Sequence, residues 1–316
     1  MEPAADAVTA PARLKGVLSP VVTPFRSDLS PDPQRFVRHC KWLLAHGCSG
    51  LAVFGTNSEA NSLSADERMM LLEQLVESSV PAAQLMPGTG CSALTDSVRL
   101  TAHAVKVGCA GALMLPPFYY KGVPDEGLYR NFSEVIQRVG DDRLQLYLYH
   151  IPPVAQVPIT LGLIERLLRA YPKTVAGVKD SSGDWANTKA MIDAFAKQGF
   201  DVFAGSEVFL LRNMRAGGVG CITAGANVNP HGIDQVYRGW QSPDAEALQA
   251  AIDKVRQVLQ SQVSMIPALK AAIAHYAGDP EWLTVRPPLV ELTLEQRARL
   301  VADLHAAGFD MPGLKS

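Results

Sequence analysis

Residues 144–179 read LQLYLYHIPPVAQVPITLGLIERLLRAYPKTVAGVK, and this stretch contains the repeating unit that decides the fold. Two short apolar runs, residues 144–149 and 175–179, are typical of buried strands. Between them, residues 161–171 place apolar side chains at helical spacing. A strand, a helix and a second strand in this order predict parallel strands joined by a crossover helix.

The same alternation continues on both sides of this unit. Strands are expected at residues 16–22, 50–54, 84–87, 110–115, 144–149, 175–179, 201–204 and 220–223. The helices between and after them are expected at residues 33–46, from 65 onward, and at 94–107, 126–139, 161–171, 185–198, 208–216 and 231–240. Ser64 with Glu67 three residues later forms a capping box that opens the second of these helices. Eight such units predict an α/β fold, a closed (β/α)8 TIM barrel rather than an open sheet.

The remaining sequence is predicted to be helical, at residues 244–265, 267–277 and 294–307. We therefore expect a flexible leader at residues 1–12, a barrel at 13–241 and a C-terminal helical extension at 242–316. The leader has neither the basic region nor the apolar core of a signal peptide.

The composition excludes several classes of protein. The chain has 316 residues and a formal net charge of -2, so nothing favours binding to nucleic acid or to a membrane surface. No apolar run approaches the length of a membrane span. Five scattered cysteines, an odd number without a C-x-x-C pair, indicate reduced thiols in a cytoplasmic protein.

In a barrel of this kind the reactive residues lie at the carboxyl ends of the strands. Lys179 ends a strand there, where burial favours the neutral amine that attacks carbonyls. The alternative is a lysine that reaches solvent or pairs with Asp180. Tyr149 ends the preceding strand, where a phenol can transfer protons, although it could also be a packing residue of the rim. Tyr147 shares its strand parity and is expected to point inward as well.

Two loops after strands add polar candidates. Residues 55–59, Gly-Thr-Asn-Ser-Glu, suit a tight loop that holds a carboxylate, or form an ordinary polar loop. Residues 116–121 contain Tyr119 and Tyr120 and could form an oligomer contact, a part of the site, or both. Most of the other ten lysines fall on helix faces or near chain ends, where a solvated charge is expected.

Other chemistries find little support. The seven histidines show no ligand spacing such as H-E-x-x-H, so no metal site is predicted. The chain has no G-x-S-x-G motif, no phosphate-binding loop and no complete dinucleotide fingerprint. No cofactor is therefore expected.

The motifs together resemble the dihydrodipicolinate synthase/N-acetylneuraminate lyase family from about residue 16 to residue 227. The resemblance lies in the loop at residues 55–59, the pair Tyr119-Tyr120, Tyr149-x-x-Pro152 and Gly177-Val178-Lys179. It also includes Pro20-Val21-Val22-Thr23-Pro24-Phe25 and Glu126-Gly127-Leu128-Tyr129.

This resemblance implies roles for individual residues. Lys179 matches the lysine that forms a Schiff base with pyruvate, and Tyr149 the phenol that moves protons. Thr56 matches the hydroxyl of the proton relay, and with Asn57 it matches the pair that binds the pyruvate carboxylate.

Further roles follow from the same resemblance. Tyr120 matches a tyrosine that reaches into a neighbouring subunit, as expected in a homotetramer built as a dimer of dimers. Ile222 matches a residue that lines the pyruvate pocket. Gly205 matches a glycine near the second substrate, and Glu207 falls where lyases of sugar acids carry acidic residues.

The departures from the family bear on the substrate. Asn57 and Ser58 replace Thr-Gly or a similar pair. Val154 stands where the synthases carry an arginine that binds a carboxylate, which argues against synthase activity and favours a hydrophobic aldehyde.

We expect an aldolase that joins or cleaves pyruvate and an aldehyde, the joined form being a 4-hydroxy-2-oxo acid. The alternatives are a 2-keto-3-deoxy acid dehydratase, an aromatic hydratase-aldolase and dihydrodipicolinate synthase. A barrel that binds pyruvate without turnover is the alternative from a different class.

Overall fold

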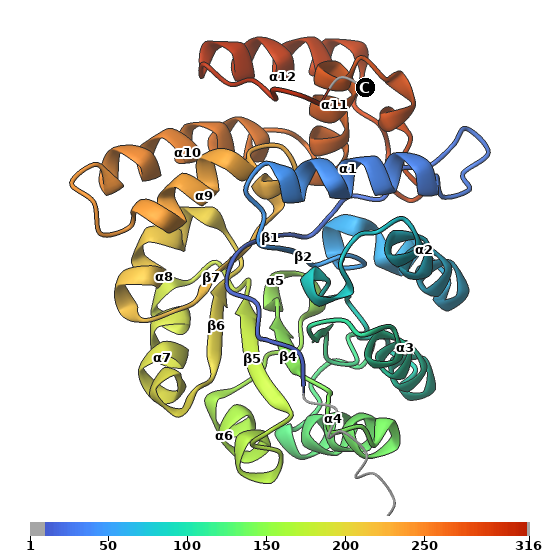
Figure 1. The fold of residues 1–316 in the computed structure, drawn as a ribbon, viewed down its shortest axis with the longest axis vertical. Coiled ribbons are helices and arrows are strands. Elements are labelled where there is room, and N and C mark those ends of the chain that lie inside the picture. Colours follow the sequence, from blue (N-terminus) through green and yellow to red (C-terminus); the bar gives the residue numbers. More distant parts are fainter. Residues whose placement is uncertain (1–9, 315–316) are drawn as a thin grey trace, which may run out of the picture.

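The computed structural model of the chain describes residues 10–314. Within them, seven parallel strands form one sheet in the order β2-β1-β7-β6-β5-β4-β3 (Figure 1). The strands are β1 (Gly16–Ser19), β2 (Gly50–Leu51), β3 (Ala112–Met114), β4 (Leu146–His150), β5 (Val175–Asp180), β6 (Asp201–Ala204) and β7 (Gly220–Ile222). The parallel pairing predicted from the alternation of strands and helices is confirmed.

Residues 85–89 join the two edge strands and close the sheet into a barrel. Leu85 forms a parallel bridge with Leu51 of β2, and Gly88 forms one with Leu113 of β3. The closed α/β barrel predicted from the sequence is therefore confirmed, and residues 85–89 take the place of its eighth strand.

The strand predicted at residues 84–87 does not form as a regular strand, and this prediction is wrong. Residue 84 ends a 3-10 turn, η3 (Ala82–Gln84). Pro87 has no N–H to donate to a ladder. Gly88 passes so close to the loop after β2 that a Cβ there would lie 2.2 Å from the Phe54 carbonyl oxygen. Isolated β-bridges to β2 and β3 therefore hold residues 85–89 in the barrel.

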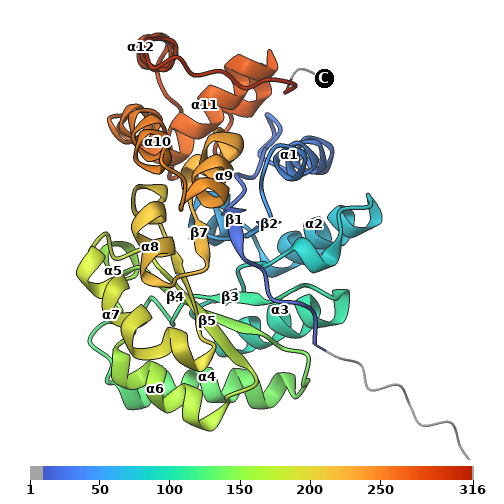
Figure 2. The same cartoon turned by 60° about the vertical axis from the view of Figure 1, so that its left-hand side comes forward.

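Helices cover the outside of the barrel, and the last three form a layer beside α1 and α9 (Figures 1 and 2). The helices are α1 (Pro33–Ala45), α2 (Ala65–Glu77), α3 (Leu94–Val107), α4 (Asp125–Val139), α5 (Pro152–Ala155), α6 (Leu161–Ala170), α7 (Trp185–Phe195), α8 (Leu210–Ala216), α9 (Pro230–Gly239), α10 (Ala245–Gln260), α11 (Met265–Ala277) and α12 (Leu294–Ala306). No helix of residues 10–314 is both long enough and apolar enough to span a bilayer.

Local signals in the sequence set most helix ends. The capping box before α2 is confirmed, because Ser64 Oγ accepts from the Glu67 amide at 3.1 Å and Glu67 Oε2 accepts from the Ser64 amide at 2.9 Å. Helix α3 has the predicted bounds and ends at Gly108, whose φ of 91° is accessible to glycine at little cost.

The helices differ from the predicted ones at two places. The short helix α5 after β4 was not predicted. The boundary between the helices predicted at residues 244–265 and 267–277 was misplaced, because α10 ends earlier, at Gln260, and α11 begins at Met265. Pro267 lies in the first turn of α11, where its missing N–H costs no hydrogen bond.

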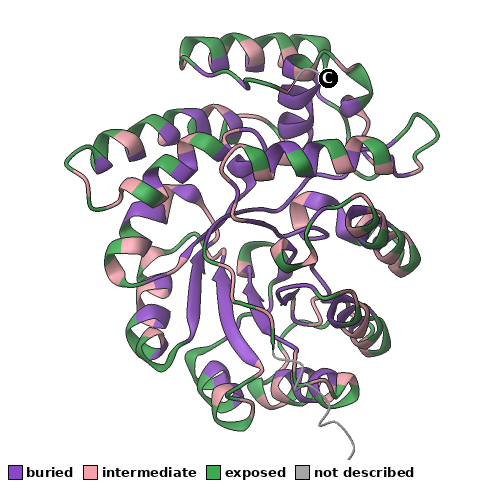
Figure 3. Cartoon of the chain, in the orientation of Figure 1, coloured by how far each residue is buried: buried purple, intermediate pink, exposed green. Residues whose placement is uncertain are grey.

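The sheet is buried throughout, and the helices expose only their outer faces (Figure 3). Tyr147 points into the barrel, as its strand parity predicted, and its hydroxyl donates to Asp201 Oδ2 at 3.1 Å. Burial raises the pKa of the Tyr147 phenol. Gly177 leaves room for this ring, since a Cβ there would lie 2.9 Å from Tyr147 Cδ1.

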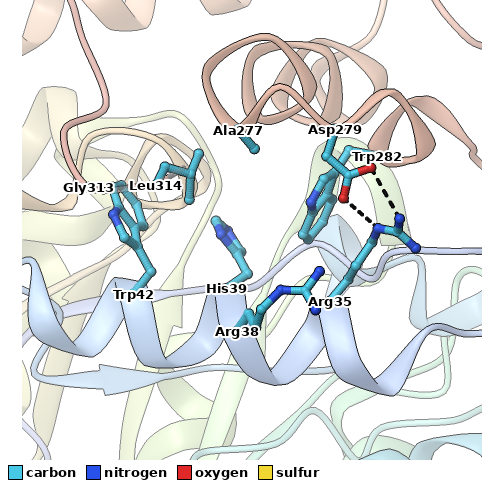
Figure 4. A pocket seen from close by; sticks show the side chains of 9 residues that line it. All are labelled: Arg35, Arg38, His39, Trp42, Ala277, Asp279, Trp282, Gly313 and Leu314. Atoms are coloured by element: carbon cyan, nitrogen blue, oxygen red, sulfur yellow. Dashed lines mark hydrogen bonds and ion pairs between the residues drawn. The ribbon is translucent and has the colours of Figure 1, made fainter. Parts of the chain in front are cut away.

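The C-terminal extension packs on α1 around a pocket of about 190 Å³ (Figure 4). Arg35 Nε donates to Asp279 Oδ2 at 2.6 Å at one side of this pocket. The His39 ring lies 5.9 Å from the Trp42 ring and 5.1 Å from the Trp282 ring. Burial lowers the pKa of His39 to about 3, so this contact between the extension and the barrel is held by neutral rings.

Candidate active site

Lys179 lies at the carboxyl end of β5, and its side chain is only 2% exposed. It is in register with Tyr149 of β4, so the two side chains lie on the same face of the sheet. Lys179 Nζ donates to the Tyr149 hydroxyl at 3.2 Å and lies 4.2 Å from the centre of the ring. The structure thus brings together the two residues that the strand ends predicted.

The alternative pairing of Lys179 with Asp180 does not occur. Successive side chains of a strand point to opposite faces, and the Asp180 carboxylate accepts from Thr188 Oγ1 at 2.6 Å and from the Ser182 amide at 2.9 Å. Within residues 10–314, Lys179 forms no ion pair. Its amine therefore lies inside the protein beside a phenol and without a carboxylate partner.

Tyr149 connects Lys179 to the loop after β2. Its hydroxyl lies 3.3 Å from Thr56 Oγ1, at hydrogen-bonding distance. Burial alone would raise the pKa of the Tyr149 phenol, but the charge of Lys179 and the hydrogen bonds to the phenol oxygen outweigh it and lower the pKa. The phenol is therefore a better proton donor than a free tyrosine.

The loop after β2 is a 3-10 turn, η1 (Thr56–Ser58), that begins at Gly55. The Gly55 amide donates to Ser58 Oγ at 3.2 Å, and Thr23 Oγ1 donates to the Ser58 carbonyl at 2.7 Å. Ser58 is buried, whereas Thr56 and Asn57 line a cavity. The loop thus directs a hydroxyl and an amide to the cavity.

Glu59 ends this turn in the left-handed region, at φ 54°, and its carboxylate is held by the C-terminal extension. Lys270 of α11 forms a hydrogen-bonded ion pair with Glu59 Oε1 and donates to the Thr284 carbonyl at 2.9 Å. The Arg286 amide donates to Glu59 Oε2 at 2.9 Å. A lysine on a helix was generally expected to carry a solvated charge. That expectation is wrong for Lys270, whose side chain is 0% exposed.

The cavity has a volume of about 470 Å³ and lies at the carboxyl ends of the strands. Six of the residues predicted for the site line it: Lys179, Tyr149, Thr56, Asn57, Val154 and Gly205. A Cβ on Gly205 would lie 2.1 Å from Ser181 Oγ, so a larger residue would displace the serine that also lines the cavity.

Three predicted site residues do not line this cavity. Ile222 is fully buried inside the barrel, and Tyr120 is 59% exposed, with its ring 5.5 Å from that of Tyr119. Glu207, expected to face the substrate, is instead 2% exposed, and its carboxylate accepts from Arg256 and Thr223. The Glu207 carboxylate therefore lies behind the cavity wall and not on the surface of the cavity.

Arg256 of α10 lines the cavity and was missed in the sequence. A signal for it existed, because Ile252, Val255 and Leu259 are buried on the same face of α10. A charged residue within the apolar face of an amphipathic helix needs a partner inside the protein. Sequence reasoning placed this helix outside the barrel and did not connect it to the site.

The arrangement provides the parts of amine catalysis on a carbonyl. Lys179 can act as a nucleophile, the Tyr149 phenol can give and take a proton, and Thr56 extends the proton path. Among residues 10–314 no cluster of His, Cys, Asp or Glu has the arrangement of a metal site.

Comparison with known proteins agrees with this arrangement. Residues 13–307 match the Dihydrodipicolinate synthetase family. An "Uncharacterized DapA-like lyase" from Chloroflexus aurantiacus is 34% identical over 293 residues, which cover 92% of this chain and 96% of the relative.

Two solved structures are similar over almost their whole length. Dihydrodipicolinate synthase from Agrobacterium tumefaciens has a TM-score of 0.86 at 29% identity, covering 93% of this chain and 99% of that one. A prophage protein of the dihydrodipicolinic acid synthase family from E. coli K12, in complex with pyruvate, has a TM-score of 0.87 at 25% identity, covering 94% and 100%. The chain therefore belongs to the Dihydrodipicolinate synthetase family and is a lyase of the class I aldolase type.

Proposed function

We propose that this enzyme joins or cleaves pyruvate and an aldehyde through a Schiff base on Lys179. The observation that carries the proposal is the position of its Nζ, buried without a carboxylate partner and 3.2 Å from the Tyr149 hydroxyl. The relative from E. coli K12 was solved in complex with pyruvate, which supports pyruvate as the keto acid.

In the direction of bond formation, neutral Lys179 attacks C2 of pyruvate. Loss of water gives an iminium, which is an electron sink, so C3 can lose a proton and become an enamine. The enamine attacks the aldehyde carbon and forms the C3–C4 bond, and the aldehyde oxygen takes up a proton to become the 4-hydroxyl group. Water then hydrolyses the iminium, which releases the 4-hydroxy-2-oxo acid and regenerates the amine.

Tyr149 and Thr56 supply and remove the protons of these steps. Both oxygens lie on one hydrogen-bonded path to Lys179, with separations of 3.2 and 3.3 Å. Thr56 and Asn57 bind the pyruvate carboxylate and so orient the enamine toward the aldehyde.

Tyr120 supports the proposal of a homotetramer. This side chain and that of Tyr119 are 59% and 75% exposed, on a loop after β3 that contributes nothing to the cavity of its own chain. A second copy of the chain would cover these rings. Sedimentation of the wild type and of Tyr120→Ala tests this: the variant should dissociate toward dimers or monomers, and an unchanged tetramer would exclude Tyr120 from the interface.

Borohydride trapping tests the Schiff base itself. The enzyme is incubated with pyruvate, reduced with sodium borohydride and analysed by intact mass and peptide mapping. An adduct of pyruvate mass on Lys179 is expected. An adduct with a longer 2-keto-3-deoxy acid, but not with pyruvate, would favour a dehydratase. The absence of an adduct with every 2-oxo acid tested would overturn the proposal.

A further inference from the structure

The cavity that contains Lys179 has a second cationic side chain, that of Arg256. Among residues 10–314 that line the cavity, these two are the cations and Asp180 is the acid. The carboxylate of Asp180 already accepts hydrogen bonds from Thr188 and Ser182. Apart from Lys179, Arg256 is therefore the side chain of this cavity whose charged N–H donors can bind an anionic group of a ligand.

Arg256 is held in place from behind by Glu207. Arg256 Nη1 donates to Glu207 Oε2 at 3.0 Å, and Thr223 Oγ1 donates to the same carboxylate oxygen. Gly225 packs against this carboxylate so closely that a Cβ there would lie 1.8 Å from Oε1. The Gln249 side chain fixes the backbone of Glu207, donating to its carbonyl at 3.0 Å.

The guanidinium keeps donors for another partner. It has five N–H groups, and its one hydrogen bond within residues 10–314 uses Nη1. Nε is buried and has no partner among the described residues. A guanidinium that is fixed at one edge and has free N–H donors at its other edges can bind a carboxylate through bidentate hydrogen bonds.

We propose that Arg256 binds a carboxylate carried by the aldehyde substrate. This inference rests on the proposed function, because it assigns the second substrate of the same site. It places the anion-binding group on α10 of the C-terminal extension, whereas the short helix α5 after β4 offers Val154. Glu207 is then a positioning residue, which explains why its carboxylate turns away from the cavity.

This inference revises the hydrophobic aldehyde expected from Val154 alone. Val154 does line the cavity and is 62% exposed, but Arg256 lines it too. Val208, Phe209 and Met265 complete apolar walls that suit a short carbon chain. The substrate class that fits both features is an aldehyde with a carboxylate at its far end.

A matched pair of aldehydes tests the assignment. Condensation with pyruvate is measured for succinic semialdehyde and for its neutral amide, which has the same number of heavy atoms. The wild type should prefer the carboxylate in kcat/KM by about tenfold to a hundredfold, the range for a charge-assisted hydrogen bond. Arg256→Met should remove this preference, and Arg256→Lys should restore part of it.

Controls separate specificity from folding and from the first half-reaction. Lys254→Met removes an exposed cation from the same helix and should keep the preference. The double variant Arg256→Met/Glu207→Gln avoids leaving the Glu207 carboxylate buried without its cation. Like Arg256→Met, it should show no preference for the aldehyde that carries the carboxylate. Pyruvate trapping on Lys179 is measured in every variant, since an adduct shows that the pyruvate site is intact.

The outcomes distinguish the two proposals. No pyruvate adduct in the wild type would overturn the proposed function. If the wild type forms the pyruvate adduct but prefers the amide in kcat/KM, the role of Arg256 is overturned. The same holds if Arg256→Met forms the adduct and loses activity equally toward both aldehydes. Loss of the pyruvate adduct in folded Arg256→Met would place Arg256 at the pyruvate carboxylate instead and would also overturn it.

Discussion

Lys179 and Lys270 are both buried, with 2% and 0% of their side chains exposed, but their surroundings differ. Lys270 has a carboxylate partner, Glu59, and its charge is used to hold the turn that carries Thr56 and Asn57. Lys179 has a phenol partner, and its Nζ faces a cavity of about 470 Å³. A buried amine with an anionic partner is a structural element, whereas one beside a phenol and an open cavity is available for chemistry.

The largest expected effect is that of Lys179→Ala. This variant should have no measurable condensation or cleavage and no borohydride adduct, because no other described residue that lines the cavity is an amine. Lys173→Ala, an exposed lysine before the same strand, is the matched control and should behave like the wild type. Near-normal turnover in Lys179→Ala would break the distinction between the two lysines.

Tyr149→Phe should lower kcat by about 10²- to 10⁴-fold, the usual contribution of a positioned acid–base group. The phenol is the direct partner of Lys179, and the ring that remains would keep the packing. Trapping of the pyruvate adduct should still occur, but more slowly. Equal rates in the variant and the wild type would show that another group moves the protons.

Lys270→Met should destabilise the fold by about 3–5 kcal/mol, because it leaves the Glu59 carboxylate buried without its cation. The double variant Lys270→Met/Glu59→Gln should recover part of the loss. Chemical denaturation measures both. If Lys270→Met lost activity in the folded state without losing stability, the structural role of Lys270 would be contradicted.

The smallest effect concerns pH. Burial lowers the pKa of Lys270 from 10.5 to about 8, although Glu59 opposes this shift. Between these values the unfolded chain binds a proton that the folded protein has released, so the free energy of unfolding rises with pH across this window.

The double variant Lys270→Met/Glu59→Gln lacks this titration and serves as the reference. The difference in stability between wild type and double variant should shift in favour of the wild type from pH 8 toward 10. A difference that stays constant with pH would mean that Lys270 remains charged throughout.

The two lysines also differ in how far the sequence revealed them. Lys179 and Tyr149 end strands of a recognisable barrel, so their place follows from the alternation of strands and helices alone. Lys270 and Arg256 come from helices beyond the barrel, and the pattern of these helices does not say which loops or cavities they reach. Each lies on a buried helix face, which indicates a partner but does not name it.

The sequence by itself determined the parallel barrel, most helix ends and the strand-end pair of amine and phenol, because these depend on local periodicity, capping and turn chemistry. Only the tertiary structure decided the closure of the barrel by residues 85–89, the turn of Glu207 away from the cavity, and the ion pairs of Arg256 and Lys270. The physical reason is that these contacts join residues 49 and 211 positions apart in the chain. Their energies depend on burial and on partners that no local pattern contains.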